Sequence, residues 1–402
     1  MNQVGEDCGR ATRFLRVSPQ SKPRKKKQGK APGRRPQQQS PYGALLESAA
    51  ALRSESWLLA DAWASELYAT LWLAGSGRSQ MIEALAAMDD PAALTALRAL
   101  SGVGDEETRA AAAAAAETVA ARGVAEPSWY VPGAALEFRE AFLVTNLLGD
   151  VEVVAITQER ASARETVLFM RQPVLGATAI ELFATPDEGT TALLEDMIAS
   201  TPEAFRDLIT PLSAAEAFDR VWPDVEQFWE DGPDEEAEEG LIGSEDVRHP
   251  IQLIALADAR VSALVTDDHE IPVVSPERTD EVVEAFLASE HGIADVEAAR
   301  AFARIVAGAA VEQNRDPVVY GPASLTAVLI LNVAARLHVS DADLALLPDI
   351  VRAWAYFTAD ARDLPRDEAR AAWDEELPTV LAEFSEAYAD PELAAERDGQ
   401  FR

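Results

Sequence analysis

Lysine and arginine side chains gather near the N-terminus, and groups of this kind bind phosphates and carboxylates. All five lysines of the chain lie between residues 22 and 30. The predicted anion-binding bases are Lys22, Arg24, Lys25, Lys26, Lys27, Lys30, Arg34 and Arg35. Clustered bases release counterions from a polyanion and bind it without sequence specificity. No aromatic residue interleaves with the cluster, so stacking on single-stranded bases is not predicted.

The charge of the chain is strongly segregated. Residues 1–40 carry a net charge of +9, whereas the whole chain carries −34, which leaves −43 for residues 41–402. An acidic body of this kind repels nucleic acid, so we expect such a contact to be made through residues 1–40 alone. Two alternatives remain for this segment, which could act only as a solubilising tail or could lie on the acidic body. The acidic body could also mimic nucleic acid, although a solvated acidic surface is the simpler interpretation.

A second group of residues combines the oxygen and nitrogen ligands that metal ions use. His249, Asp267, Asp268 and His269 are the candidates, and a hard or borderline metal could take such groups. However, the surrounding sequence TDDHEIP is typical of an exposed polar loop, and no HExxH spacing places two histidines on one helical face. We therefore interpret this segment as a polar loop and expect neither a metal nor another cofactor.

Sequence motifs for nucleophilic or phosphate chemistry are missing. The segment Gly75-Ser76-Gly77-Arg78 lacks the Gly-Lys pair of a phosphate-binding loop and reads as a helix stop. No G-x-S-x-G motif occurs, and Cys8 is the only cysteine, so no disulfide can form within the chain. Val17 is an alternative bacterial start, which would remove Cys8. The sequence thus predicts no catalytic residues.

The elements that position these groups are mainly helical. Residues 1–40 have few large apolar groups and are predicted to be disordered, because they cannot bury enough surface to offset the entropy of ordering. Apolar periodicity predicts a helix over 42–73, and Asp90 is expected to cap a short helix over 91–100. Asp105 and the two glutamates after it are expected to start an alanine-rich helix, where their charge favours the helix dipole. Residues 136–184 alternate with a period of two and predict an antiparallel meander with strands at 138–145, 151–158, 164–170 and 177–183. Helices are predicted next at 190–198, 202–209 and 214–229.

The segment 230–243 is rich in acidic residues and is expected to link two domains. We predict a disordered tail (1–40), a helix–meander–helix domain (41–229), the linker (230–243) and an all-helical domain (244–402). In the last domain, helices are expected at 245–264, 276–289, 296–311, 324–337, 342–361 and 366–388. The fold class is therefore α+β and predominantly helical, with a small antiparallel meander packed against helices.

Several segments carry a resemblance. The basic tail, WASELYATLW, DPAALTALRAL, the meander and LLPDIVRAWAYFTADARDLPRDE together resemble a family of uncharacterised actinobacterial proteins. The resemblance spans most of the chain and implies the same fold, but it implies no activity. The meander of that family is associated with a histidine-containing stretch, where this chain has Arg171-Gln172-Pro173.

These patterns favour a soluble, cytoplasmic protein. The longest apolar run, residues 325–333, is too short to span a membrane. We expect a non-enzymatic interaction protein that the basic tail tethers to an anionic partner such as RNA, the ribosome or the nucleoid DNA. The alternatives are an enzyme that uses acids and histidines of the C-terminal domain, and a helical scaffold that binds a protein partner.

Overall fold

The computed structural model describes residues 42–75, 77–149, 152–171, 181–186, 209–231, 252–266, 269–291 and 296–400. The described residues from 44 onward belong to one compact unit. The predicted fold class is confirmed, since the described chain is mostly helical and includes one small antiparallel sheet. No described helix is both long enough and apolar enough to cross a membrane.

Short helices form the first described part of the chain. They are α2 (Gly43–Ala51), the 3-10 turn η1 (Leu52–Ser54), α3 (Trp57–Leu73), α4 (Arg78–Ala86), α5 (Pro91–Leu100) and α6 (Glu106–Ala120). The predicted cap at Asp90 is present, since its carboxylate accepts from the Ala92 N–H at 2.7 Å. Asp105, predicted only to start the next helix, also caps it by accepting from the Thr108 N–H at 2.6 Å. The predicted continuous helix over 42–73 is wrong, because Ser56 caps a new helix at α3.

The sheet follows these helices and has five strands in the described chain. The strands are β1 (Glu137–Thr145), β2 (Glu152–Arg160), β3 (Ala163–Arg171), β4 (Glu181–Pro186) and β5 (Ile209–Leu212), in the order β4-β3-β2-β1-β5. The pairs are antiparallel, as the meander predicted. Ala161 and Ser162 join β2 to β3 with positive φ angles of 50° and 71°, a turn that fits the twist of a hairpin. The predicted helix over 202–209 is wrong at its end, because Ile209 begins β5.

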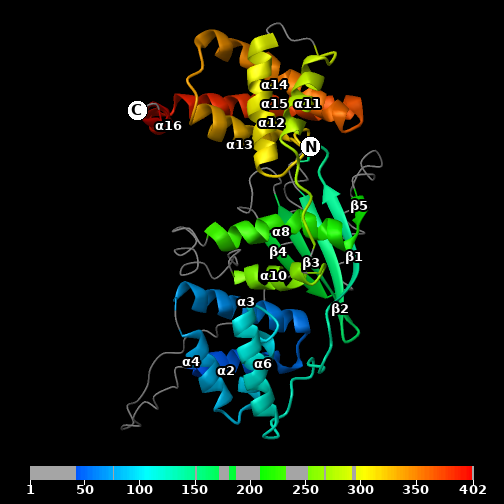
Figure 1. Ribbon diagram of the computed structural model, residues 1–402, viewed down its shortest axis with the longest axis vertical. Coiled ribbons are helices and arrows are strands. Elements are labelled where there is room, and N and C mark those ends of the chain that lie inside the picture. Colours follow the sequence, from blue (N-terminus) through cyan, green and yellow to red (C-terminus); the bar gives the residue numbers. More distant parts are fainter. Residues whose placement is uncertain are drawn as a thin grey trace, which may run out of the picture. The chain divides into compact units, whose positions relative to one another are not determined.

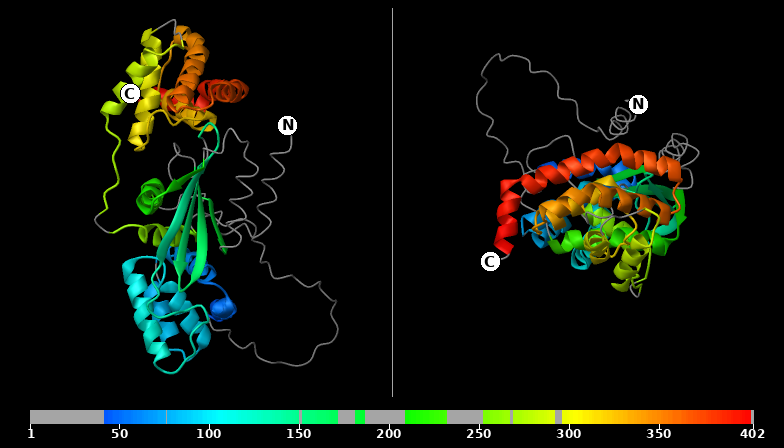
Figure 2. Two further views of the ribbon diagram at one scale, coloured as in Figure 1. Left: turned by 90° about the vertical axis from the view of Figure 1, so that its right-hand side faces the viewer. Right: turned by 90° about the horizontal axis from the view of Figure 1, so that it is seen from above.

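Two helices cover one face of the sheet. α8 (Ala214–Asp231) and α10 (Ile254–Ser262) lie across the strands in Figure 1, and the turned view in Figure 2 places α8 beside the sheet. Apolar side chains of both helices share a buried cluster with Val154 and Phe169 of the sheet and Leu58 of α3. α10 follows the predicted linker in sequence but packs with the elements that precede it. Residues 232–251 lie outside the described chain, so the domain boundaries stay a prediction.

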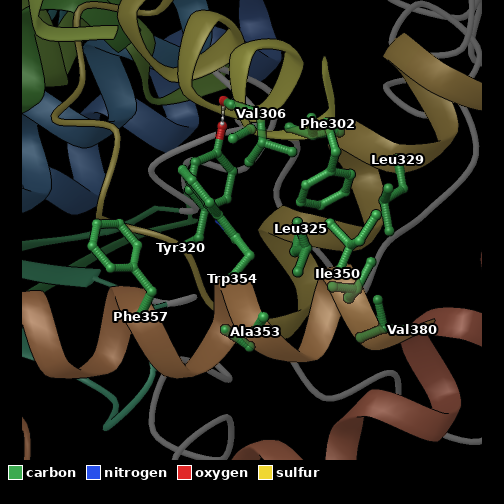
Figure 3. Close-up of a cluster of buried hydrophobic side chains, with 14 of the residues drawn as sticks. Phe302, Val306, Tyr320, Leu325, Leu329, Ile350, Ala353, Trp354, Phe357 and Val380 are labelled. Atoms are coloured by element: carbon green, nitrogen blue, oxygen red, sulfur yellow. Dashed lines mark hydrogen bonds between the residues drawn. The ribbon is translucent and has the colours of Figure 1, made fainter. Parts of the chain in front are cut away.

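The C-terminal helices enclose a second apolar core. They are α11 (Glu277–Leu287), α12 (Val296–Glu312), α13 (Pro322–Val328), the π-helical turn η5 (Leu329–Ala334), α14 (Asp341–Ala361), α15 (Arg366–Ala389) and α16 (Pro391–Gln400). Trp354 is fully buried beside Phe302 and Phe357 (Figure 3), and the nearby Tyr320 hydroxyl donates to the Val306 carbonyl at 2.6 Å. The helices predicted here are confirmed within a few residues at most ends, and α16 was not predicted.

Candidate functional site

The bases predicted to bind anions all lie within residues 1–41, outside the described chain. Their disorder and their binding role therefore stay predictions. The described chain does show how the arginines of the body are used. Apart from Arg336, every described arginine forms an ion pair or a hydrogen bond with another residue of the protein.

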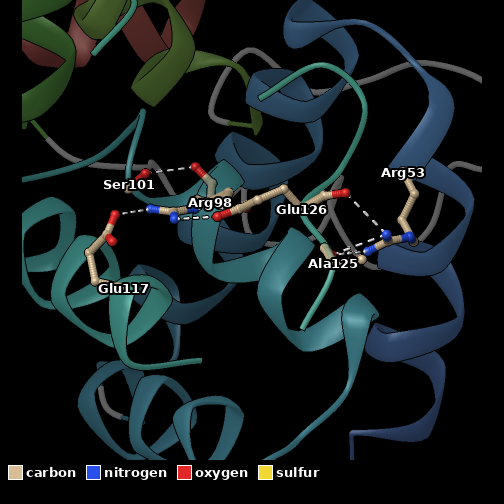
Figure 4. A network of polar contacts seen from close by, with 6 residues as sticks. All are labelled: Arg53, Arg98, Ser101, Glu117, Ala125 and Glu126. Carbon is tan, nitrogen blue, oxygen red and sulfur yellow. Dashed lines mark hydrogen bonds and ion pairs between the residues drawn. The ribbon is translucent and has the colours of Figure 1, made fainter. Parts of the chain in front are cut away.

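Arg98 shows this internal use clearly (Figure 4). Its guanidinium is 4% exposed and donates to Glu117 at 2.7 Å and to Glu126 at 2.5 Å and 3.1 Å. The same group stacks over the Tyr130 ring at 3.9 Å. Arg53 donates to the backbone carbonyl of Glu126, which fixes the chain after α6. Donors that are used in this way position helices and leave little for an external anion.

The residues considered as metal ligands do not come together in the described chain. His249, Asp267 and Asp268 lie outside it, and only His269 can be placed. The His269 Nε2 atom is 2.6 Å from Asp219 Oδ1 of α8, and its ring meets Phe218 edge-on. Among the described residues, no three His, Cys, Asp or Glu side chains form a group that could hold a metal ion.

A pocket of about 280 Å³ lies beside Asp219. The start of β2, the first half of α8, the segment before α11 and the loop after α12 form its walls. The lining residues are Glu152, Glu216, Asp219, Arg220, Ile271, Pro272, Asn314, Arg315, Asp316 and Val319. Both signs of charge and three apolar side chains are therefore present in one small concave site, a combination typical of binding sites for small polar molecules.

The loop after α12 is held firmly at this pocket. Arg315 N–H donates to the Ala310 carbonyl at 2.8 Å and Asn314 N–H donates to the Val311 carbonyl at 2.9 Å, which is the Schellman pattern of a helix end. Asn314 takes the left-handed conformation that this pattern needs, with φ of 53°. Its side-chain amide donates to the Pro272 carbonyl at 3.0 Å. These bonds fix the backbone from which the Arg315 side chain extends.

A buried cluster of charges stands behind the pocket. Arg171 of β3 is 2% exposed and donates to Glu152 at 2.7 Å and to Asp224 at 2.5 Å and 3.1 Å. Two pocket arginines contact the same carboxylates, with Arg220 at 3.0 Å from Glu152 and Arg315 at 3.5 Å from Asp224. Burial raises the pKa of Asp224 above its ordinary value, although Arg171 acts to lower it. Three guanidinium groups thus face two carboxylates here.

A second buried cluster is closed to solvent. Arg260 of α10 is 1% exposed and contacts Asp61 of α3 at 2.8 Å and Glu165 of β3 at 3.1 Å. Glu165 also accepts from the Leu58 N–H at 2.9 Å, and Arg160 lies 3.3 Å from Asp61. Burial raises the pKa of Glu165, while the charge of Arg260 acts to lower it. This cluster ties α3, the sheet and α10 together.

Sequence reasoning missed every pocket residue, although Asp219 contacts the candidate ligand His269. Arg220 and Arg315 are 95 positions apart in a chain with many arginines, and no spacing rule connects them. The one local signal was the Ser213–Glu216 pair, in which each side chain caps the other's backbone N–H at 3.2 Å and 2.8 Å, a pattern that marks a helix start rather than a site.

Comparison of the chain with protein-family models, with curated proteins and with solved structures found no match. The resemblance to an actinobacterial family therefore stays a prediction, and the function has to be argued from this chain alone.

Proposed function

We propose that this is a non-enzymatic interaction protein of the cytoplasm, tethered by its basic N-terminal segment to an anionic polymer such as RNA, the ribosome or DNA. The observation that carries the proposal is the separation of charge, +9 in residues 1–40 against −43 in the rest. A polyanion is attracted to the first region and repelled by the second. Binding therefore depends on the bases from Lys22 to Arg35.

The use of the body's arginines supports the proposal. Phosphate binding needs guanidinium or ammonium donors that are available to an external partner. Nearly all described arginines of the body already contact carboxylates or carbonyls of the protein, as Arg98 and Arg260 do. The lysines, which bind phosphates as mobile point charges, occur in the N-terminal segment alone.

A matched pair of variants tests this proposal. One variant replaces Lys25, Lys26, Lys27 and Lys30 with Gln, and the other replaces four arginines of the body that are about half exposed. These arginines are Arg164, Arg304, Arg352 and Arg366. Fluorescence anisotropy with a labelled single-stranded RNA measures the affinity at about 0.1 M salt.

We expect the lysine variant to lose at least about a hundredfold in affinity, because each lost phosphate contact removes its counterion release. The arginine variant should change the affinity by less than about threefold, since its charges act only from a distance. Equal losses of RNA affinity in the two variants would contradict the proposal. RNA affinity that neither set of replacements changes would contradict it as well.

Purification from the native cell, with and without nuclease, separates the remaining alternatives. Recovery with nucleic acid that nuclease abolishes supports the tethering function. A stable protein partner that resists nuclease favours the helical scaffold instead.

An enzyme is the second candidate because His269 is held against Asp219, which lines a pocket. A carboxylate that contacts one ring nitrogen orients a histidine for proton transfer. Stoichiometric metal in the purified protein, lost when His249 and His269 are both replaced by Ala, would favour this enzyme reading. We expect that double variant to leave folding and metal content unchanged.

A further inference from the structure

We infer that the pocket between α8 and the loop after α12 binds a small zwitterion of the amino-acid type. The carboxylate of the ligand would contact Arg220 and Arg315, and its ammonium group would contact Glu216. This assignment is independent of the basic N-terminal segment and of the function proposed above.

The positive half of the site comes from the buried charge cluster. Arg171 donates through three of its nitrogens and is fully engaged with Glu152 and Asp224. In the described chain, Arg220 uses one nitrogen for Glu152, and Arg315 makes one longer contact with Asp224. A guanidinium has five N–H donors, so both pocket arginines keep donors for a ligand. Because Arg171 contacts both acids, each of the two pocket arginines is anchored to a member of the same buried cluster.

The negative half is Glu216, in the first turn of α8. The Ser213 N–H and hydroxyl both donate to one oxygen, Oε2, each at 2.8 Å. These hydrogen bonds lower the pKa of Glu216, the backbone N–H most strongly, so the group is ionised at neutral pH. Its hydrogen-bond partners are neutral, and the charge of nearby Arg220 also acts to lower its pKa. The other oxygen, Oε1, can accept from the ammonium group of the ligand.

The remaining pocket acids have partners within the protein. Asp219 contacts His269 at 2.6 Å. Asp316 accepts from the Val318 N–H at 3.1 Å and contacts Arg278 at 3.3 Å. A plain anion such as phosphate would be attracted by Arg220 and Arg315 but repelled by Glu216, whereas the ammonium group of a zwitterion would compensate that carboxylate. A ligand that carries both charges satisfies both halves of the site.

Size and apolar lining narrow the ligand further. The volume of about 280 Å³ lies at the lower edge of the range for small-molecule sites, roughly 300–1,000 Å³. Polymers are too large for it. Ile271, Pro272 and Val319 offer an apolar wall to an aliphatic side chain. A free amino acid with a short or aliphatic side chain fits these features together.

Calorimetric titration of the intact chain with the standard amino acids tests the inference, with leucine amide and N-acetylleucine as derivatives that each lack one charge. We expect at least one free amino acid to bind, and expect removal of either charge to weaken binding at least tenfold. Each such loss corresponds to about 1.4 kcal/mol. The titration should reach about 10 mM amino acid, which is far above a micromolar Kd. If no amino acid binds at that concentration, the inference is wrong.

Paired variants then assign the two halves. Arg315→Gln should weaken binding of the free amino acid and should lose less affinity than the wild type when the ligand's carboxylate is removed, because only Arg220 then contacts that carboxylate. The affinity of Glu216→Gln should not change when the ligand's ammonium group is removed. The reason is that the effects of two changes do not add when the changed groups contact each other. Arg304→Gln, which lies outside the pocket lining, is the control and should bind normally. Circular dichroism verifies that the variants fold. Losses that add independently in every combination would overturn the inference, as would inorganic phosphate that binds as tightly as the amino acid.

Discussion

The positively charged residues of this chain occur in two regions that use them differently. Residues 1–40 hold a net charge of +9 and all the lysines, whereas the body relies on arginine within a net charge of −43. In the described body these arginines contact the protein's own carboxylates and carbonyls, as Arg260 does with Asp61 and Glu165. The comparison teaches that the number of cations in a region does not identify a binding surface. A region can bind an external anion only if the donors of its cations are not already used within the protein.

The largest effect on stability should come from Arg260. Replacing it with Met leaves Asp61 and Glu165 buried beside each other without their main counter-charge, and losing one member of a buried ion pair costs about 3–5 kcal/mol. Urea denaturation measures this loss in the free energy of unfolding. The RNA affinity of the folded variant should stay unchanged, since Arg260 is buried against carboxylates of the protein and is not available to RNA. A decrease in RNA affinity would show that a buried arginine of the body also contributes to RNA binding, which contradicts the distinction between the two regions.

Replacing Arg171 with Met should cost less, about 1.5–3 kcal/mol, the value for hydrogen bonds to charged groups. The reason is that Arg220 and Arg315 remain beside Glu152 and Asp224 after Arg171 is lost. Urea denaturation of both variants shows which of the two buried clusters contributes more to the free energy of unfolding. A larger loss for Arg171 than for Arg260 would show that the pocket arginines give no compensation.

Glu165 should make stability depend on pH, because burial raises its pKa in the folded state. Its contribution is fully present below the unfolded pKa of about 4.5, and it decreases as the pH rises through the folded pKa. The wild type should therefore lose stability relative to Glu165→Gln over this window, by up to about 1.4 kcal/mol per pH unit. Urea midpoints of both proteins from acidic to neutral pH measure the difference. A constant difference would mean that Arg260 cancels the effect of burial.

The smallest effect should come from an exposed arginine of the body. Arg366 is 52% exposed and contacts Asp360 at 2.7 Å and Glu290 at 2.8 Å. Exposed ion pairs are screened by water and contribute little to stability. Arg366→Gln should thus lower the urea midpoint by less than either Arg260→Met or Arg171→Met does. A loss of stability as large as that of Arg260→Met would show that the exposure of an arginine does not determine how much it contributes to stability.

Much of the fold could be predicted because its signals are local. Asp90 before Pro91, and Asp105 before a run of alanines, marked helix starts that the structure contains. The period-two pattern likewise located β1, β2 and β3. The turn at Ala161 and Ser162 has no glycine or asparagine and carried no such signal. β5 was missed because four residues are too few to show a period.

The pocket and the packing of α10 could not be predicted, since they depend on partners far apart in the chain. Arg260 looks like a surface residue in the sequence, yet it is buried because Asp61 lies opposite, 199 positions earlier. The periodicity of α10 predicts an apolar face but does not identify the sheet as its partner. His269 was considered with its sequence neighbours, whereas its contact is Asp219 on α8.

The salt dependence of RNA affinity tests the central claim most directly. If six to eight bases of residues 22–35 contact phosphates at once, the slope of log affinity against log salt should be about −4 to −7. Replacing all eight predicted bases with Gln should abolish binding, and the slope with it. A slope near zero for the intact chain would contradict the account, and so would a steep slope that survives the eight replacements, because the body's own cations would then contact the polymer.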